Sequence, residues 1–422
     1  MVSSAGAVCK SGVLVREGIG SALKRYFGRV DFSPIARTEM DFGKMRGEFD
    51  YKLALSKAYE SARGGFLTPC EIFAPYYSFG IARWMLSRGL GKATRPTIIE
   101  FGGGTGSNAN NVLDFLKSAA PEAYEKVRYV NVDISEPLAD RAMKRNERHG
   151  DRFRSIPLHI DWQRSDLVPD DFLESEPVFV LALELLDNFP HDKVRFERKS
   201  HESAWTPTQQ ARVVVDEQGR PAEIFEELKD TYIQKAASIL PSSSPPHQKK
   251  NSPITQFLKR IFGRRKEESE LRRDVFVPTG ALIWLENLKK AFPAHHLFVA
   301  DFDALPPPTL PQNDQAINAP LVANPDGSDR PSYLDALDGS ADIFFATDFS
   351  YLKRAYGITN NNNNTPIVKK AADFFRPYAH PCATRSGYNP LLADFTNTSV
   401  FMASTESPST FQDDEEQQQL RR

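Results

Sequence analysis

The chain has 422 residues, of which 53 are Lys or Arg and 55 are Asp or Glu, so its formal net charge is −2. This length allows one large domain with appendages or two domains, and the balanced charge creates no overall field that would favour nucleic acid or an anionic membrane as partner. Its three widely spaced cysteines fit neither a disulfide framework nor a CxxC metal site, and no apolar run approaches the roughly 18 residues of a membrane span. We therefore expect a soluble, non-secreted protein that holds no metal.

The first 45 residues form a basic segment that we treat separately. Between positions 10 and 30 there are five basic residues against one acid, Glu17. The basic residues are Lys10, Arg16, Lys24, Arg25 and Arg29. This composition resembles an organellar presequence. A basic surface helix over "SALKRYFGRV" accounts for the same residues, and the sequence leaves both interpretations open.

Residues 46–94 are predicted to be the helical N-terminal part of a catalytic domain. The stretch "TPCEIFAPYYSFGIARWMLSRG" has apolar residues at helical spacing and ends at Gly89. A helix of this kind is expected to lie over a sheet.

Residues 95–238 are predicted to form the core of that domain. The apolar runs in "PTIIEF", "VRYVNVDIS", "FRSIPLHIDW" and "PVFVLALELLD" read as strands, and helical patterns follow the first two. This alternation is typical of βαβ units on a parallel sheet. "ARVVVDEQGRPAEIF" adds a hairpin that turns at 217–219. We expect an α/β fold with a doubly wound, mostly parallel sheet, additional helical and hairpin elements, and a ligand at the carboxyl ends of the strands.

The second half of the chain alternates between ordered and low-complexity stretches. Residues 239–274 are rich in Ser, Pro and charge and are predicted to be a disordered insertion. Order resumes over 275–400 with "VFVPTGALIWLENLKKAF", "HHLFVADF" and "DIFFATDFSYLKRAY", separated by long loops. These residues complete the same catalytic domain. Residues 401–422 are predicted to be a disordered tail.

The stretch "EFGGGTG" (100–106) is the strongest chemical signal in the chain. Glycine at 102, 104 and 106 removes the Cβ atoms that would obstruct a ligand and permits positive φ at a strand-to-helix turn. A dinucleotide site has the spacing G-x-G-x-x-G, whereas E-x-G-x-G-x-G is typical of S-adenosylmethionine sites in class I methyltransferases. We predict that Gly102, Gly104 and Gly106 contact this cofactor and that Glu100 binds its amino group. A tight turn without a ligand is the alternative.

Two further acids end the next two predicted strands. Asp133 ends "YVNVD", where an acid can accept hydrogen bonds from both ribose hydroxyls, as it does in dinucleotide folds. Asp161 ends "LHID", and we expect it to meet the adenine edge. Asp133 could instead cap the helix that begins at Ser135, and for Asp161 a purely structural role is an equal alternative.

The predicted catalytic residues are Glu184 and Asp187 in "ALELLDNFPHD", just after the fourth strand. Positioning alone can lower the barrier to methyl transfer by roughly 7–11 kcal/mol. If the acceptor is arginine, its protonated guanidinium must also approach the cationic sulfonium. Paired carboxylates would offset that repulsion and hold the acceptor bidentately. The alternative is that both acids cap or bridge nearby elements.

Four motifs in this order resemble the MidA-like family over residues 48–356. G-D-F-x-T-x-P-E-I of that family is similar to "GGFLTPCEI", and E-x-G-x-G-x-G matches "EFGGGTG". N-E-x-x-D-A-x-P resembles "LELLDNFP", and D-I-T-x-H-V-D-F resembles "DIFFATDF". Gly65, Leu183, Ala346 and Thr347 stand where the family has Asp, Asn, His and Val. The cofactor site is therefore better matched than the acceptor site, as in a divergent branch.

The resemblance implies an S-adenosylmethionine-dependent protein arginine N-methyltransferase located in mitochondria, in the matrix. Its partner would be an arginine-bearing protein, such as a subunit of respiratory complex I during assembly. Two alternatives remain open: a non-catalytic mitochondrial assembly chaperone that keeps the methyltransferase fold, and a methyltransferase that acts on a small molecule. The sequence does not define the oligomeric state.

Overall fold

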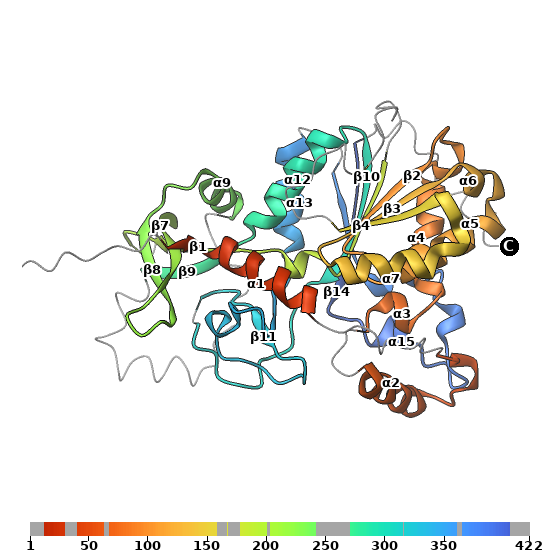
Figure 1. Ribbon diagram of the computed structural model, residues 1–422, viewed down its shortest axis with the longest axis horizontal. Helices are drawn as coiled ribbons and strands as arrows, with labels where there is room; N and C mark the ends of the chain where they lie inside the picture. The colour runs from red at the N-terminus through yellow and green to blue at the C-terminus, as the bar shows by residue number, and fades with distance from the viewer. Residues whose placement is uncertain are drawn as a thin grey trace, which may run out of the picture.

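The computed structural model describes residues 12–29, 40–62, 67–157, 167, 178–200, 203–241, 271–314, 316–360 and 365–405. A seven-stranded sheet lies at its centre (Figure 1). In sheet order the strands are β13 (Ile367–Lys370), β14 (Thr398–Ser404), β10 (His295–Phe302), β5 (Val178–Leu183), β2 (Thr97–Phe101), β3 (Arg128–Asp133) and β4 (Phe153–Pro157). The five strands from β10 to β4 are parallel, and β14 and β13 add antiparallel pairs at one edge.

Helices cover both faces of this sheet, which explains why its central strands are buried along nearly their whole length and are mainly apolar. In β2, Ile98 belongs to the core under α4 (Tyr76–Ser87) and α5 (Ser107–Ala119), while Ile99 belongs to the core under α12 (Thr279–Ala291) and α13 (Phe349–Asn360). Neighbouring strand residues point to opposite faces, so a strand covered on both sides is apolar throughout. The predicted doubly wound, mostly parallel α/β fold is confirmed.

A second, fully antiparallel sheet is inserted between β5 and β10. Its order is β1 (Val13–Leu14), β7 (Thr206–Val215), β6 (Asp192–Glu197) and β9 (Arg272–Val277), and β8 (Pro221–Glu227) pairs with β7. The β7–β8 pair is the predicted hairpin, and Gly219 in its turn has a φ of +80°. The short helix α9 (Thr231–Ile239) follows and buries Ile233 in the core shared with α12.

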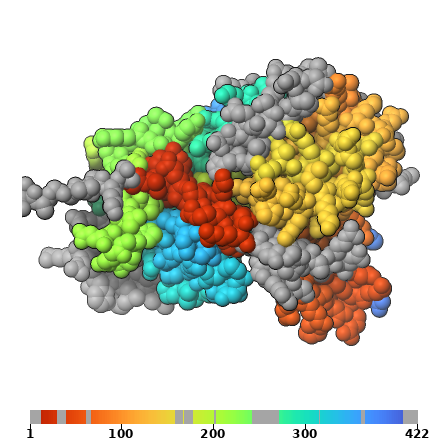
Figure 2. All heavy atoms as spheres, in the orientation of Figure 1, coloured from red at the N-terminus to blue at the C-terminus, as the bar shows by residue number. Residues whose placement is uncertain are grey.

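Helix α1 (Val15–Arg29) lies across the molecule between the second sheet and α7 (Glu136–Asn146), as Figures 1 and 2 show. Its buried residues Val15, Ile19, Leu23 and Tyr26 recur every three or four positions, which places them on one face of the helix. The structure therefore includes residues 13–29 in the folded protein, although the sequence set them apart as part of a basic N-terminal segment. Residues 1–11 and 30–39 lie outside the described residues.

Three segment boundaries differ from the sequence prediction. Residues 401–404 were assigned to a disordered tail, but they continue β14, where Phe401 is fully buried and pairs with Val299 of β10. Likewise, residues 272–274 were assigned to the insertion but begin β9, because β6 pairs with them. One of the long loops predicted within 275–400 is partly a strand. It contains β11 (Leu321–Ala323), which pairs with β12 (Asp342–Phe344). The rest of the insertion (242–270) and of the tail (406–422) lies outside the described residues.

Three further helices precede the central sheet or connect its first strands. These are α2 (Glu48–Ala62), α3 (Pro69–Ile72) and, between β2 and β3, α6 (Pro121–Lys126). At the other end, α14 (Ala371–Phe375) and α15 (Pro390–Ala393) lie between the edge strands β13 and β14. Within the described ranges, no helix combines the length and apolar character needed to cross a membrane.

Candidate cofactor and acceptor site

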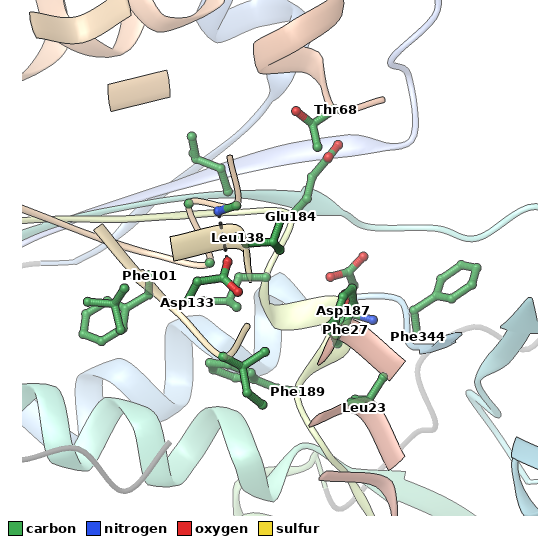
Figure 3. Close-up of a pocket in the computed structure, with 18 of the residues that line it drawn as sticks. Leu23, Phe27, Thr68, Phe101, Asp133, Leu138, Glu184, Asp187, Phe189 and Phe344 are labelled. Atoms are coloured by element: carbon green, nitrogen blue, oxygen red, sulfur yellow. Dashed lines mark hydrogen bonds between the residues drawn. The ribbon is translucent and has the colours of Figure 1, made fainter. Parts of the chain in front are cut away.

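A pocket of about 700 Å³ opens at the carboxyl ends of β2, β3 and β5 (Figure 3). This is the edge of a doubly wound sheet where ligands bind. The glycine turn, α1, α3 and α12 all contribute to its lining. The acids predicted at the ends of the first, second and fourth strands all line this pocket. They are Glu100, Asp133, Glu184 and Asp187.

The three spaced glycines all have positive φ, but they face different surroundings. A Cβ on Gly102 would lie 2.8 Å from the side chain of Leu185, and one on Gly106 would lie 2.7 Å from Asn146 Nδ2 of α7. Among the described residues, a Cβ on Gly104 would meet nothing within 4 Å, and Gly104 lines the pocket. Gly106 is absent from the pocket lining. The turn therefore leaves space for a ligand at Gly104. At Gly106, the absence of a Cβ instead allows α5 and α7 to pack closely.

Glu100 lies beneath the glycine turn and is almost completely buried. Its Oε1 accepts a hydrogen bond from Asn108 Nδ2 at 3.0 Å, and its Oε2 accepts one from the Tyr129 hydroxyl at 2.7 Å. A Cβ on Gly103 would come within 2.9 Å of that Oε2. Burial raises the pKa of Glu100 to about 7, although these two hydrogen bonds act in the opposite direction.

Replacing Glu100 with Gln should change how stability depends on pH. Folding favours the protonated form of Glu100, because its pKa rises from 4.5 to about 7. This contribution to the free energy of unfolding of the wild type is complete below about pH 4.5 and is lost as the pH rises to about 7. Gln stays neutral throughout. We expect the free energy of unfolding of Glu100→Gln, relative to wild type, to rise by about 3 kcal/mol over this window, measured by urea unfolding. A difference that does not vary with pH would contradict this.

Asp133 ends β3 and holds the glycine turn from the other side. Its Oδ2 accepts a hydrogen bond from the Gly104 N–H at 3.0 Å, and its Oδ1 accepts one from the Ser135 N–H at 2.9 Å (Figure 3). Burial raises its pKa to about 6. Asp133 therefore lies in the pocket, and its contact with Ser135 precedes α7 without capping the helix. Its predicted contact with the ribose remains a prediction. Asp161 lies outside the described residues, so its predicted contact with adenine remains a prediction.

Glu184 follows β5 directly and has an unusual backbone conformation, with a φ of +49°. A side chain other than glycine adopts this region at a cost, and such residues cluster at functional sites. Its N–H donates to the Ala300 carbonyl at 2.8 Å, which fixes the turn. The side chain enters the pocket and is directed toward Thr68 (Figure 3). Among the described residues, Glu184 Oε1 has no hydrogen-bond partner although it is shielded from solvent.

Asp187 lies one helical turn further on, in the 3₁₀ turn η4 (Leu186–Asn188), and also lines the pocket. Its Oδ1 is likewise buried without a hydrogen-bond partner among the described residues. Burial raises the pKa values of Glu184 and Asp187 well above their ordinary range, and the nearby charge of Asp301 adds to both shifts. The two predicted catalytic carboxyl groups are thus brought together in one desolvated region that is rich in acids.

Two further acids support this region: Asp301 at the end of β10, and Asp342, the first residue of the "DIFFATDF" motif. Asp301 Oδ2 accepts hydrogen bonds from the N–H groups of Leu186 and Asp187 at 2.8 and 3.1 Å, so it fixes the η4 turn. Asp342 lines the pocket, and its Oδ1 accepts a hydrogen bond from Asn188 Nδ2 at 2.9 Å. Burial raises the pKa of each to about 7. The described residues contain no group of His, Cys, Asp and Glu that could hold a metal ion.

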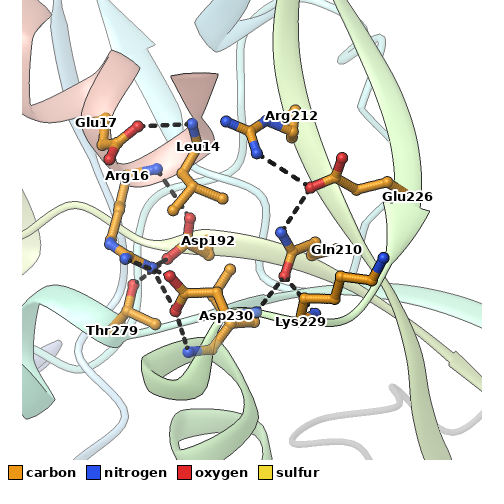
Figure 4. Close-up of polar contacts among 11 residues, drawn as sticks. Leu14, Arg16, Glu17, Asp192, Gln210, Arg212, Glu226, Lys229, Asp230 and Thr279 are labelled. Carbon is orange, nitrogen blue, oxygen red and sulfur yellow. Dashed lines mark hydrogen bonds and ion pairs between the residues drawn. The ribbon is translucent and has the colours of Figure 1, made fainter. Parts of the chain in front are cut away.

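Helix α1 forms a wall of the pocket that the sequence did not predict. Leu23 and Phe27 line the pocket, and the Phe27 carbonyl accepts a hydrogen bond from the Ser135 hydroxyl at 2.9 Å. At its other end, Arg16 forms ion pairs with Asp192 and Asp230, both at 2.8 Å (Figure 4). The helix is therefore tied to both the second sheet and the cofactor side of the pocket. Its amphipathic pattern was visible in the sequence, but its acidic partners are more than 170 residues away.

A family described as putative S-adenosyl-L-methionine-dependent methyltransferases matches residues 80–367. The mitochondrial protein arginine methyltransferase NDUFAF7 homolog of Saccharomyces cerevisiae is 23% identical over 307 residues, which cover 69% of this chain and 67% of the yeast protein.

Two crystal structures of proteins from Burkholderia thailandensis share the fold. One is an uncharacterized protein with a TM-score of 0.52 and 15% identity, and the other, bound to S-adenosyl-homocysteine, has a TM-score of 0.51 and 14% identity. Each match covers 93% of both chains.

Proposed function

The chain belongs to the family of putative S-adenosyl-L-methionine-dependent methyltransferases, and from this premise we propose that it methylates an arginine side chain of a protein. The family match and the yeast relative also confirm the resemblance to the MidA-like family that the motifs indicated. S-adenosylmethionine is therefore its cofactor. When bound, the cofactor supplies a methyl group on a positively charged sulfur.

The pocket fits this cofactor. Gly104 leaves open space where a Cβ would stand, and the carboxylate of Asp133 lies beside it at the end of β3. In the proposed arrangement the Gly102–Gly104 backbone lies against the cofactor and Asp133 accepts hydrogen bonds from the ribose hydroxyls. Glu100 holds the turn in shape from below through its contacts with Asn108 and Tyr129.

The observation that carries the arginine proposal is the pair of buried carboxylate oxygens without partners, Glu184 Oε1 and Asp187 Oδ1. Ionised carboxylates in a desolvated pocket are costly unless a cation pairs with them. A guanidinium ion is planar, stays protonated and presents several N–H donors that match two carboxylates at once. These features favour a guanidinium as the group that completes the site.

In this proposal Glu184 and Asp187 perform three tasks. They orient the guanidinium so that one nitrogen faces the methyl group, and their charge offsets the repulsion between the guanidinium and the sulfonium. They also draw positive charge toward the nitrogens that do not react. Asp301 acts through them, because it fixes the η4 backbone that carries Asp187.

We further propose that the protein that accepts the methyl group is mitochondrial. The yeast relative is named as a mitochondrial protein arginine methyltransferase, and this supports mitochondria as the location. The matrix is the compartment that the MidA-like resemblance implies. A subunit of respiratory complex I is the acceptor that the MidA-like resemblance favours. Because α1 lines the pocket, we expect any presequence to be cleaved before residue 12.

The proposal is tested by supplying methyl-labelled S-adenosylmethionine and the purified protein to mitochondrial proteins from cells that lack the gene. Label recovered as methylarginine after acid hydrolysis of the protein fraction is the expected result. Label confined to the soluble small-molecule fraction would replace the proposal with a small-molecule methyltransferase. Binding of a partner protein without transfer of label would instead favour the assembly chaperone.

A further inference from the structure

Glu71 is a second acidic residue on the cofactor side of the pocket, and nothing in the sequence assigned it a role there. It lies on α3, the short helix before α4, and lines the pocket together with Gly104 and Thr105. Its Oε1 accepts hydrogen bonds from the hydroxyls of Thr105 and Ser107, both at 3.2 Å. These two residues connect Gly104 to the start of α5, so Glu71 is held against the outer end of the glycine turn.

The second carboxylate oxygen of Glu71 has no partner within the described residues. Oε2 is shielded from solvent yet accepts no hydrogen bond there. Arg145 is on the Oε1 side: its guanidinium is 3.9 Å from that oxygen and donates to the Thr105 hydroxyl at 2.7 Å. A buried acceptor without a donor is costly, and a charged ligand donor would relieve the cost.

Glu100 is the acid that the motif spacing indicated for the cofactor's amino group, but its surroundings are different. Both of its oxygens already accept hydrogen bonds from neutral donors, Asn108 and Tyr129. The Gly103 backbone covers it closely, since a Cβ there would meet Glu100 Oε2 at 2.9 Å. Glu71 differs because one of its oxygens, Oε2, has no hydrogen-bond partner among the described residues.

We propose that Glu71, and not Glu100, binds the ammonium group of the methionine portion of S-adenosylmethionine. An ammonium ion offers three donors and a full positive charge, which is the chemistry that a buried unpaired carboxylate oxygen selects. Asp133 accepts a hydrogen bond from the Gly104 N–H, and Glu71 accepts one from the hydroxyl of the next residue, Thr105. The ribose and the amino group of one ligand would therefore be recognised on either side of Gly104. This assignment concerns cofactor recognition and holds whatever the acceptor is.

The test uses two ligands that differ at a single group. One is S-adenosylhomocysteine, and the other is its analogue with hydrogen in place of the α-amino group. Calorimetric titration of the wild type should show about 10- to 100-fold weaker binding of the deaminated analogue. Equal affinity for the two ligands would overturn the proposal without any variant being made, and no methyl acceptor is involved.

Two variants then show which acid, Glu71 or Glu100, binds the ammonium group. Glu71→Gln should weaken binding of S-adenosylhomocysteine about 10- to 100-fold and leave the deaminated analogue within about threefold of wild type. Glu100→Gln should retain the wild-type preference for the amino group. Loss of that preference in Glu100→Gln but not in Glu71→Gln would overturn the assignment, as would equal weakening of both ligands in Glu71→Gln. A single cooperative thermal transition in each variant confirms that it is folded.

Discussion

Replacing Glu184 with Gln is expected to lower kcat for methyl transfer by about 100-fold or more, with little change in the affinity for S-adenosylmethionine. Gln is close to Glu in shape but lacks the negative charge that offsets the cationic acceptor. The loss of one preorganised electrostatic contact costs about 3 kcal/mol in the transition state. Glu184 directly follows β5, and its Oε1 is shielded from solvent without a hydrogen-bond partner among the described residues. Single-turnover kinetics with saturating cofactor measure the effect.

Two further variants show whether the loss of kcat is specific to the carboxylates that are proposed to bind the acceptor. Asp187→Asn should show a loss of the same order, because its Oδ1 is the other buried oxygen without a partner among the described residues. Glu122→Gln on α6, an exposed position, is the control and should leave kcat unchanged. Wild-type rates in both Glu184→Gln and Asp187→Asn would show that these carboxylates do not act on the acceptor.

Replacing Arg16 with Ala should have the largest effect on stability, lowering the free energy of unfolding by about 3 kcal/mol or more. The guanidinium pairs with Asp192, whose side chain is fully buried, and with Asp230. Removing one member of a buried pair leaves an uncompensated charge, which typically costs about 3–5 kcal/mol. Thr279 still donates to Asp192 Oδ2 but carries no charge. Urea unfolding measures the change.

Arg16→Ala should also weaken cofactor binding, because the same helix places Leu23 and Phe27 in the pocket. Arg220→Ala is the matched control: its side chain is 70% exposed and pairs with Asp216 in a hairpin turn, so both stability and affinity should stay close to wild type. An Arg16→Ala variant as stable as the control would mean that α1 is not anchored through this residue.

The sequence was most informative where structure is determined locally. The parallel strands, the hairpin turning near Gly219 and the glycine turn after β2 follow from short patterns: continuous apolar runs, turn residues and glycine spacing. The acids at strand ends were predicted for the same reason, since the carboxyl ends of parallel strands share one edge of the sheet. Of these acids, Glu100, Asp133, Glu184 and Asp187 all line the pocket.

The sequence was less informative where a contact joins distant segments. The pairing of Arg16 with Asp192 and Asp230 makes α1 part of the pocket wall, and no local pattern distinguishes such a helix from a basic presequence. Gly106 illustrates a related limit: the motif groups it with Gly104, but the approach of α7 decides what a side chain there would meet. The end of β14 was misassigned because the serine-rich tail begins within the strand.

The central claim, that the glycine turn forms the S-adenosylmethionine site, is tested most directly by calorimetric titration of the cofactor into wild type and Gly104→Val. The valine side chain would enter the pocket, since a Cβ at Gly104 meets nothing within 4 Å. Gly219→Val controls for backbone strain, because Gly219 also has positive φ and open surroundings but lies in the β7–β8 turn. We predict saturable binding by wild type and Gly219→Val and none by Gly104→Val. Equal binding by all three proteins would contradict the account.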